Sequence, residues 1–85
     1  MGLDLVEMVI RIEEEFQVAI PDGVAVTMVT PRTVIDFLMK QPQINKNLTR
    51  EYVALSLWLI LEDELAIERA YYTEDSHFIE DMGAD

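Results

Sequence analysis

The stretch YTEDSHFIEDMGAD (72–85) ends the chain, and the stretch GLDLVEMV (2–9) begins it. The closing stretch is polar and rich in turn-forming residues, apart from Phe78 and Ile79 near its middle. We expect both apolar side chains to plug a helical bundle from beneath a loop. The opening stretch predicts the start of an amphipathic helix that runs from residue 3 to about residue 17.

Together these two stretches resemble one motif of the acyl carrier protein family, cut apart and placed at opposite ends. In that family a segment like D-S-x-F-x-E-D-L-G-A-D runs directly into S-L-D-x-V-E-L-V, and the serine carries the phosphopantetheine arm. Asp85 matches the residue before that serine, and Leu3 and Asp4 match the two residues after it. Gly2 stands at the serine position, so the resemblance implies a chain without a bound phosphopantetheine cofactor.

The resemblance extends to four shorter segments at family-like spacing: EEEF (13–16), IPD (20–22), VIDFL (34–38) and LAI (65–67). It covers most of the chain in the order helix II, III, IV, I. It therefore implies an all-α, four-helix acyl-carrier-like bundle that is circularly permuted, with the two chain ends meeting at the place of the missing serine. Residues 1–85 would form one domain, with helices II to IV in 1–40, a linker in 41–47, and helix I with its following loop in 48–85.

Composition limits the class of protein. Eighty-five residues allow one small domain with a modest core, and the absence of cysteine excludes disulfides and thiolate metal sites. A formal net charge of -11 disfavours nucleic acid and anionic membranes and favours basic partner surfaces. The sequence shows neither a signal peptide nor an apolar run of about 20 residues, so we expect a cytoplasmic protein.

The first helix has two contrasting faces. Its core-facing stripe has the spacing i, i+4, i+7, i+11 and comprises Leu5, Val9, Ile12 and Phe16, with Met8 beside it. Its opposite face mixes apolar side chains with carboxylates. This face is either a solvated surface with incidental hydrophobes or, as the resemblance implies, a docking strip for a basic and partly apolar partner. The partner-binding residues would be Leu3, Asp4, Glu7, Ile10, Glu13, Glu14 and Asp85.

The middle of the chain contains a conflict between propensity and resemblance. Residues 24–29 are rich in β-branched side chains and read locally as a strand, whereas the resemblance implies a short helix or ordered loop, which we adopt. Thr30 and Pro31 are a good N-cap and first residue for the next helix. That helix should bury Val34, Ile35 and Leu38 and end before the polar linker.

The last helix should begin at Thr49 and continue to about Ala66, with Leu48 and Val53 placed to form a hydrophobic staple across the cap. It is apolar almost all round. Val53, Leu57, Ile60, Leu61 and Leu65 can serve the core. Three further apolar residues then indicate either wrapping by neighbouring segments or a homodimer contact: Leu55, Trp58 and Leu59.

We expect no catalysis by this chain. Nucleophilic catalysis needs an activated group beside a base, and the only histidine, His77, reads as a partly exposed loop residue. Ser56 lies within an apolar helix, and Ser76 or Asp75 matches a capping position, so neither serine is an attachment site.

The acidic clusters at 13–15 and at Glu80, Asp81 and Asp85 could hold Ca²⁺ or Mg²⁺ loosely, but a solvated acidic face is favoured and no metal site is expected.

The resemblance implies a non-phosphopantetheinylated module that docks on enzymes of a fatty acid, polyketide or peptide pathway. One alternative is a genuine acyl carrier that is modified at another residue or within a longer chain. A second alternative is a structural homodimerisation module.

Overall fold

The structure is a computed structural model that describes residues 2–69 and 72–84. It contains five helices in this order: α1 (Leu3–Phe16), α2 (Asp22–Ala25), α3 (Pro31–Met39), α4 (Pro42–Asn45) and α5 (Arg50–Leu65). No strand occurs among the described residues, which confirms the all-α prediction. Three helices are long and two are single turns, so the described residues form one helix more than the four expected.

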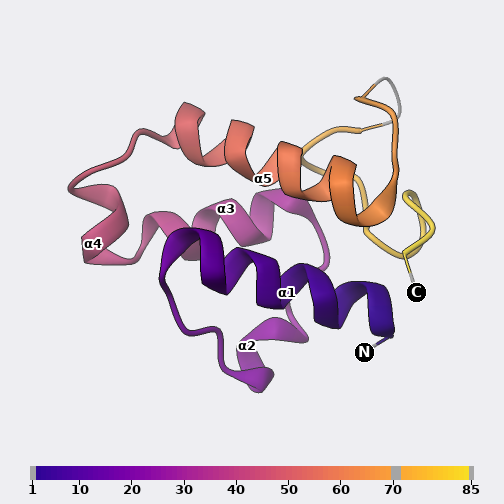
Figure 1. Ribbon diagram of the computed structural model, residues 1–85, viewed down its shortest axis with the longest axis horizontal. Helices are drawn as coiled ribbons and strands as arrows, with labels where there is room; N and C mark the ends of the chain where they lie inside the picture. Colours follow the sequence, from indigo (N-terminus) through magenta and orange to yellow (C-terminus); the bar gives the residue numbers. More distant parts are fainter. Residues whose placement is uncertain (1, 70–71, 85) are drawn as a thin grey trace.

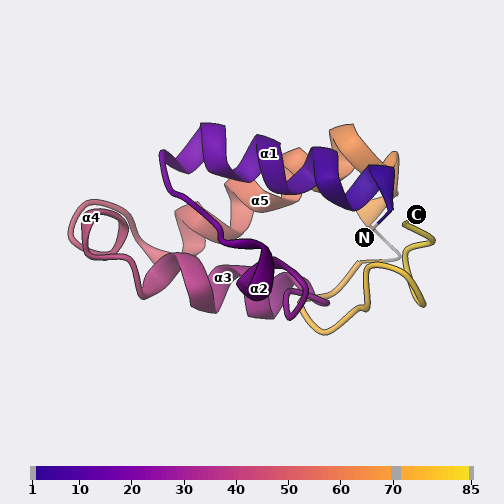
Figure 2. The same cartoon turned by 90° about the horizontal axis from the view of Figure 1, so that it is seen from below.

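The three long helices surround one core. Both α1 and α3 pack against α5, and α2 lies on the side of the molecule away from α5 (Figures 1 and 2). The α4 turn lies at one end and the tail after α5 at the other. The start of α1 and the end of the described tail also lie at this end of the molecule in the two views.

Helix α1 buries one apolar side against the core. Its buried residues are Leu5, Met8, Val9, Ile12 and Phe16, which confirms the predicted core stripe. Gln17 ends the helix in the left-handed conformation, with φ 55°. The Glu13 carboxylate then accepts a hydrogen bond from the backbone N–H of Ile20 at 2.8 Å, which secures the chain as it leaves the helix.

Residues 24–29 form no strand: residues 24 and 25 belong to a helical turn and residues 26–29 to a loop. Residues 22–25 form one helical turn that buries Ala25, and Met28 is buried just beyond it. Thr30 then caps α3 as predicted, in a reciprocal arrangement that the sequence analysis did not foresee. The Thr33 N–H donates to Thr30 Oγ1 at 3.3 Å, and the Thr30 N–H donates to Thr33 Oγ1 at 3.2 Å.

The predicted polar linker at 41–47 connects α3 to α5 and contains a short helix. Pro42–Asn45 is a helical turn, α4, and its Ile44 side chain is 2% exposed within the core. The Leu48 N–H donates to the Ile44 carbonyl at 2.8 Å and leads the chain into α5. One apolar residue in a polar segment therefore anchors the connection between α3 and α5.

Helix α5 begins after Thr49, whose hydroxyl accepts from the Tyr52 N–H at 3.1 Å, as the predicted cap requires. It ends at Ala66, which takes the left-handed conformation with φ 52°. The predicted core residues Val53, Leu57, Ile60 and Leu61 are buried, and Leu65 is half-buried.

The tail after α5 is irregular, and only one of its two predicted core residues is buried. Phe78 is 1% exposed, and its N–H donates to the Val29 carbonyl at 2.9 Å. Ile79 is 52% exposed, so the prediction that it plugs the bundle was wrong. The Ala84 N–H closes the loop by donating to the Phe78 carbonyl at 2.8 Å, and Ala84 is itself buried.

Two arginines attach the start of this tail to the bundle. Arg32 of α3 binds the Asp75 carboxylate at 2.7 Å, and its backbone N–H donates to the Glu74 carbonyl at 2.8 Å. Arg50 of α5 donates to Glu74 Oε2 at 3.1 Å and forms a second hydrogen bond to the other oxygen. The Arg50 hydrogen bond lowers the pKa of Glu74, and the Arg32 hydrogen bond lowers the pKa of Asp75.

The tail attachment should weaken in acid. Because the folded-state pKa values of Glu74 and Asp75 lie below the ordinary 4.5 and 3.8, their ion pairs stabilise the fold at neutral pH. This stabilisation is lost as the pH falls through the lowered values. An Arg50→Gln variant should be destabilised by no more than about 1 kcal/mol at pH 7, since the pair is partly exposed. Urea unfolding at pH 7 and about pH 3 should show the difference from wild type shrinking in acid. A difference that stays constant with pH would contradict this account.

Candidate functional site

The start of α1 is where the attachment serine would stand. Gly2 occupies the N-cap position with φ -73° and ψ 171°, and no side chain caps the helix there. The Val6 N–H donates to the Gly2 carbonyl at 3.1 Å, which closes the first turn. Asp85, the predicted neighbour of this position, lies outside the described residues. The helix therefore begins at a residue without a side-chain hydroxyl.

The outer face of α1 carries the predicted mixture of apolar and acidic side chains. Leu3 is 66% exposed and Ile10 is 46% exposed, and Glu7 and Glu14 are exposed between and beside them. Val6, at 39% exposed, extends the apolar part. These four predicted residues Leu3, Glu7, Ile10 and Glu14 are hereafter called the α1 strip.

Two of the other predicted partner-binding residues lie differently. Glu13 is half-buried and holds the Ile20 N–H, so its carboxylate supports the loop after α1. Asp4 is half-buried in the first turn, where a negative charge complements the helix dipole.

The only cation of α1 turns away from the strip. Arg11 donates from Nη1 to Asp63 and to Glu64 of α5, each at 2.7 Å. Both hydrogen bonds raise the pKa of the Arg11 guanidinium, and the bond to Asp63 has the larger effect. Among the described residues, neither Glu7 nor Glu14 forms an ion pair within the chain. The strip is therefore an acidic surface whose charge is left for solvent or a partner.

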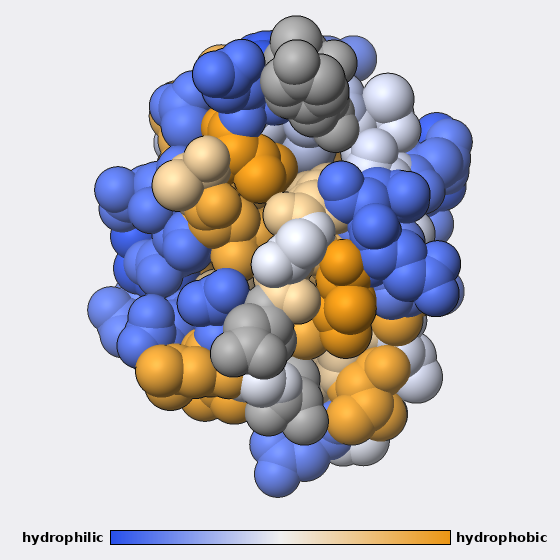
Figure 3. Space-filling model, turned by 90° about the vertical axis from the view of Figure 1, so that its right-hand side faces the viewer, coloured by the Kyte–Doolittle hydropathy of each residue, from blue (hydrophilic) through white to orange (hydrophobic). Residues whose placement is uncertain are grey.

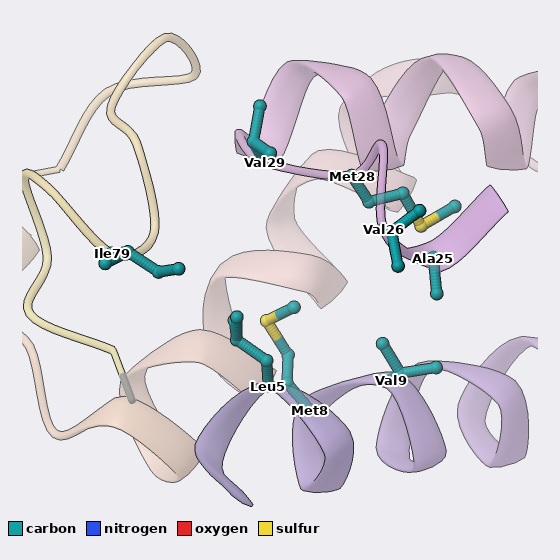
Figure 4. Close-up of a pocket in the computed structure, with 8 residues that line it drawn as sticks. All are labelled: Leu5, Met8, Val9, Ala25, Val26, Met28, Val29 and Ile79. Atoms are coloured by element: carbon teal, nitrogen blue, oxygen red, sulfur yellow. The ribbon is translucent and has the colours of Figure 1, made fainter. Parts of the chain in front are cut away.

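An apolar pocket of about 200 Å³ opens beside α1, and sequence reasoning missed it. Leu5, Met8 and Val9 point into it from α1 and face residues from the other side, as Figure 4 shows. The opposite side comes from α2, from the residues after it and from the tail, and comprises Ala25, Val26, Met28, Val29 and Ile79.

Part of the pocket wall is also open surface, because Val26 is 63% and Ile79 52% exposed. Figure 3 shows apolar side chains gathered on the end of the molecule that carries the tail, with hydrophilic side chains on both flanks. Sequence periodicity assigns Leu5, Met8 and Val9 to the core and gives no signal that they also border a cavity.

Trp58 is wrapped by its own chain. It is 4% exposed, with the Tyr72 ring 4.6 Å away and the Arg69 guanidinium 5.4 Å from its ring centroid. Burial of the Tyr72 side chain itself raises its pKa to about 12. Of the two readings of Leu55, Trp58 and Leu59, wrapping by a neighbouring segment therefore applies to Trp58. Leu55 and Leu59 remain half-exposed, at 50% and 54%.

The remaining candidate groups have structural partners. His77 Nδ1 accepts hydrogen bonds from the Ile79 and Glu80 N–H groups at 3.2 and 3.3 Å. Ser76 Oγ accepts from the Thr73 N–H at 3.0 Å and so stabilises a turn, while Asp75 pairs with Arg32 rather than capping a helix.

Within 2–69 and 72–84, no three histidine or carboxylate groups gather in a way that could hold a metal ion. No helix in the same residues has the length and apolar character to cross a bilayer. No protein-family model matches the chain, and no solved structure matches it.

Proposed function

We propose that this chain is a carrier-like docking module without a prosthetic arm, which binds enzymes of a carrier-protein-dependent pathway through the α1 strip. One observation carries this proposal: α1 leaves two apolar and two acidic side chains exposed on one face while its only cation is committed to α5. The resemblance of the chain ends to the acyl carrier motif supplies the class of partner. Gly2 supports the proposal that no phosphopantetheine is attached, since glycine has no side-chain hydroxyl to which the arm could be joined.

Mixed strips of this kind recognise a surface in two ways. Glu7 and Glu14 would attract lysine and arginine side chains of the partner, which raises the rate of association and sets orientation. Leu3 and Ile10 would lose water against apolar side chains between those cations, at roughly 25 cal/mol per Å² buried. Binding should therefore be fast, moderate in strength and weakened by salt.

The proposal predicts a large effect of charge reversal on the α1 strip. A phosphopantetheinyl transferase is a suitable probe, because every enzyme of that class must recognise carrier domains. The double variant Glu7→Lys, Glu14→Lys should weaken binding to the transferase by at least about tenfold, which is 1.4 kcal/mol. Isothermal titration calorimetry, with ¹⁵N chemical-shift mapping of the wild-type chain, measures both the affinity and the surface used.

The matched control is Glu51→Lys, Glu62→Lys on α5. These two exposed helical carboxylates undergo the same change in net charge at another face. The control should change the affinity by less than about threefold. Equal weakening by both variants would show an effect of net charge alone, and no binding by the wild type would reject the proposal.

A second candidate function is favoured by the apolar pocket. A cavity of about 200 Å³ beside the start of α1 suits the end of an alkyl chain, as a genuine acyl carrier would need. This candidate requires that the arm be attached to a residue other than Gly2. Incubation of the wild-type chain with coenzyme A and the transferase, followed by intact-mass measurement, distinguishes the two, because only a genuine carrier gains the mass of one arm.

A further inference from the structure

The outward face of α5 carries an apolar stripe that the fold does not use. Tyr52, Leu55 and Leu59 are 53%, 50% and 54% exposed and follow one another at spacings of three and four residues. They therefore lie on one side of the helix. The other side already buries Val53, Leu57, Ile60 and Leu61 in the core. A helix on the surface of a small domain needs only one apolar side, so the stripe is surplus to folding.

Acidic side chains border this α5 stripe. Glu51 and Glu62 are exposed, and the Asp63 side chain is 70% exposed. Three cations lie nearby: Arg50 binds Glu74, Arg11 binds Asp63 and Glu64, and Arg69 lies over the Trp58 ring. Glu51 and Glu62 form no ion pair among the described residues, so they leave negative charge beside the stripe.

A second copy of the chain is a poor occupant of this face. An antiparallel pairing that sets Leu55 of one copy against Leu59 of the other brings Glu51 level with Asp63, which already binds Arg11, so Glu51 meets no free cation. A parallel pairing places each carboxylate beside its own counterpart. Neither arrangement pairs the free carboxylates with cations, and each copy carries a net charge of -11.

We infer that the α5 stripe is a docking site for an amphipathic helix of another protein, with apolar side chains at i, i+3 and i+7 and lysine or arginine on the flank that faces Glu51 and Glu62. Such a helix covers Tyr52, Leu55 and Leu59 with its apolar side. Its cations meet Glu51 and Glu62, which fix its orientation. This site lies on a different helix from the α1 strip and does not depend on the carrier-like function.

The test uses a synthetic amphipathic peptide of about five turns, with leucines at i, i+3 and i+7 and lysines flanking them. A peptide of the same composition in scrambled order is the control ligand. Titration into the ¹⁵N-labelled chain should shift the amides around Tyr52, Leu55 and Leu59. The variant Leu55→Ser, Leu59→Ser should weaken binding by at least about tenfold, because it removes the apolar contact from an exposed surface.

The variant Val26→Ser, Ile79→Ser removes two exposed apolar side chains that lie on neither α1 nor α5, and it should change the affinity by less than about threefold. All four replaced side chains are at least 50% exposed, so both variants should keep the wild-type circular dichroism spectrum. The inference is overturned if the two variants weaken binding equally, if the scrambled peptide binds as well, or if no peptide binds. It is also overturned if the wild type sediments as a dimer that the Leu55→Ser, Leu59→Ser variant abolishes.

Discussion

Replacing Phe78 with alanine is expected to lower the free energy of unfolding by about 3–5 kcal/mol. The side chain is 1% exposed and belongs to the same cluster of buried residues as the cores of α1, α3 and α5. Its removal would leave a cavity where the tail joins the bundle and would remove the main apolar anchor of the tail. Since a domain of this size has only roughly 5–15 kcal/mol of stability, the variant should be close to unfolding at 37 °C.

The neighbouring substitution Ile79→Ala is the matched control. Ile79 is 52% exposed, so its truncation should cost less than about 1 kcal/mol. Urea denaturation of both variants, followed by circular dichroism, measures the contrast. Equal losses for the two variants, or a small loss for Phe78→Ala, would show that the tail does not complete the core.

Trp58→Ala is the second substitution with a large expected effect, at about 3 kcal/mol or more. Its ring is 4% exposed because Tyr72 and Arg69 cover it from the tail side. Truncation would remove the ring against which Arg69 and Tyr72 pack. Leu59→Ala, one position along α5, should cost less than about 1 kcal/mol because Leu59 is 54% exposed.

Thermal unfolding by differential scanning calorimetry separates these two variants. Tryptophan fluorescence of the wild type gives a second measure, since a buried indole emits at shorter wavelength than a solvated one. A solvated emission spectrum, or a Trp58→Ala variant as stable as Leu59→Ala, would contradict the wrapped position of the ring.

The parts of the fold that depend on local rules could be predicted from the sequence. The α1 stripe follows from helical periodicity over four turns, and the Thr30 and Thr49 caps follow from side chains that accept backbone hydrogen bonds nearby. The short helix or ordered loop at 24–29 was predicted only by resemblance, because its β-branched residues favour a strand locally. The structure has a helical turn at Asp22–Ala25 that buries Ala25 against the core, and the chain continues from it as a loop.

The errors concern contacts between segments distant in sequence. Phe78 and Ile79 are adjacent and both apolar, but Phe78 is buried and its N–H donates to the distant Val29 carbonyl, whereas Ile79 is exposed. Ile44 looks incidental in a polar linker until α3 and α5 close over it. Periodicity along one helix cannot provide this information, since it does not say where the partner segments run.

The candidate site divides in the same way. Exposure of the α1 strip follows from the helical wheel, so it could be predicted. The pairing of Arg11 with α5, the use of Glu13 to hold residue 20, and the pocket beside α1 all depend on tertiary contacts. These contacts could not be read from spacing.

The most direct measurement for the carrier-like account is the intact mass of a Gly2→Ser variant after incubation with coenzyme A and a phosphopantetheinyl transferase. Gly2 has φ -73°, which serine adopts without strain, and serine is a good N-cap. The transferase would join the phosphopantetheine phosphate to the new hydroxyl and release adenosine 3′,5′-bisphosphate from coenzyme A. The account predicts that Gly2→Ser gains the mass of one arm while the wild type does not. A folded Gly2→Ser variant that stays unmodified, while an ordinary carrier protein in the same reaction is modified, would contradict it.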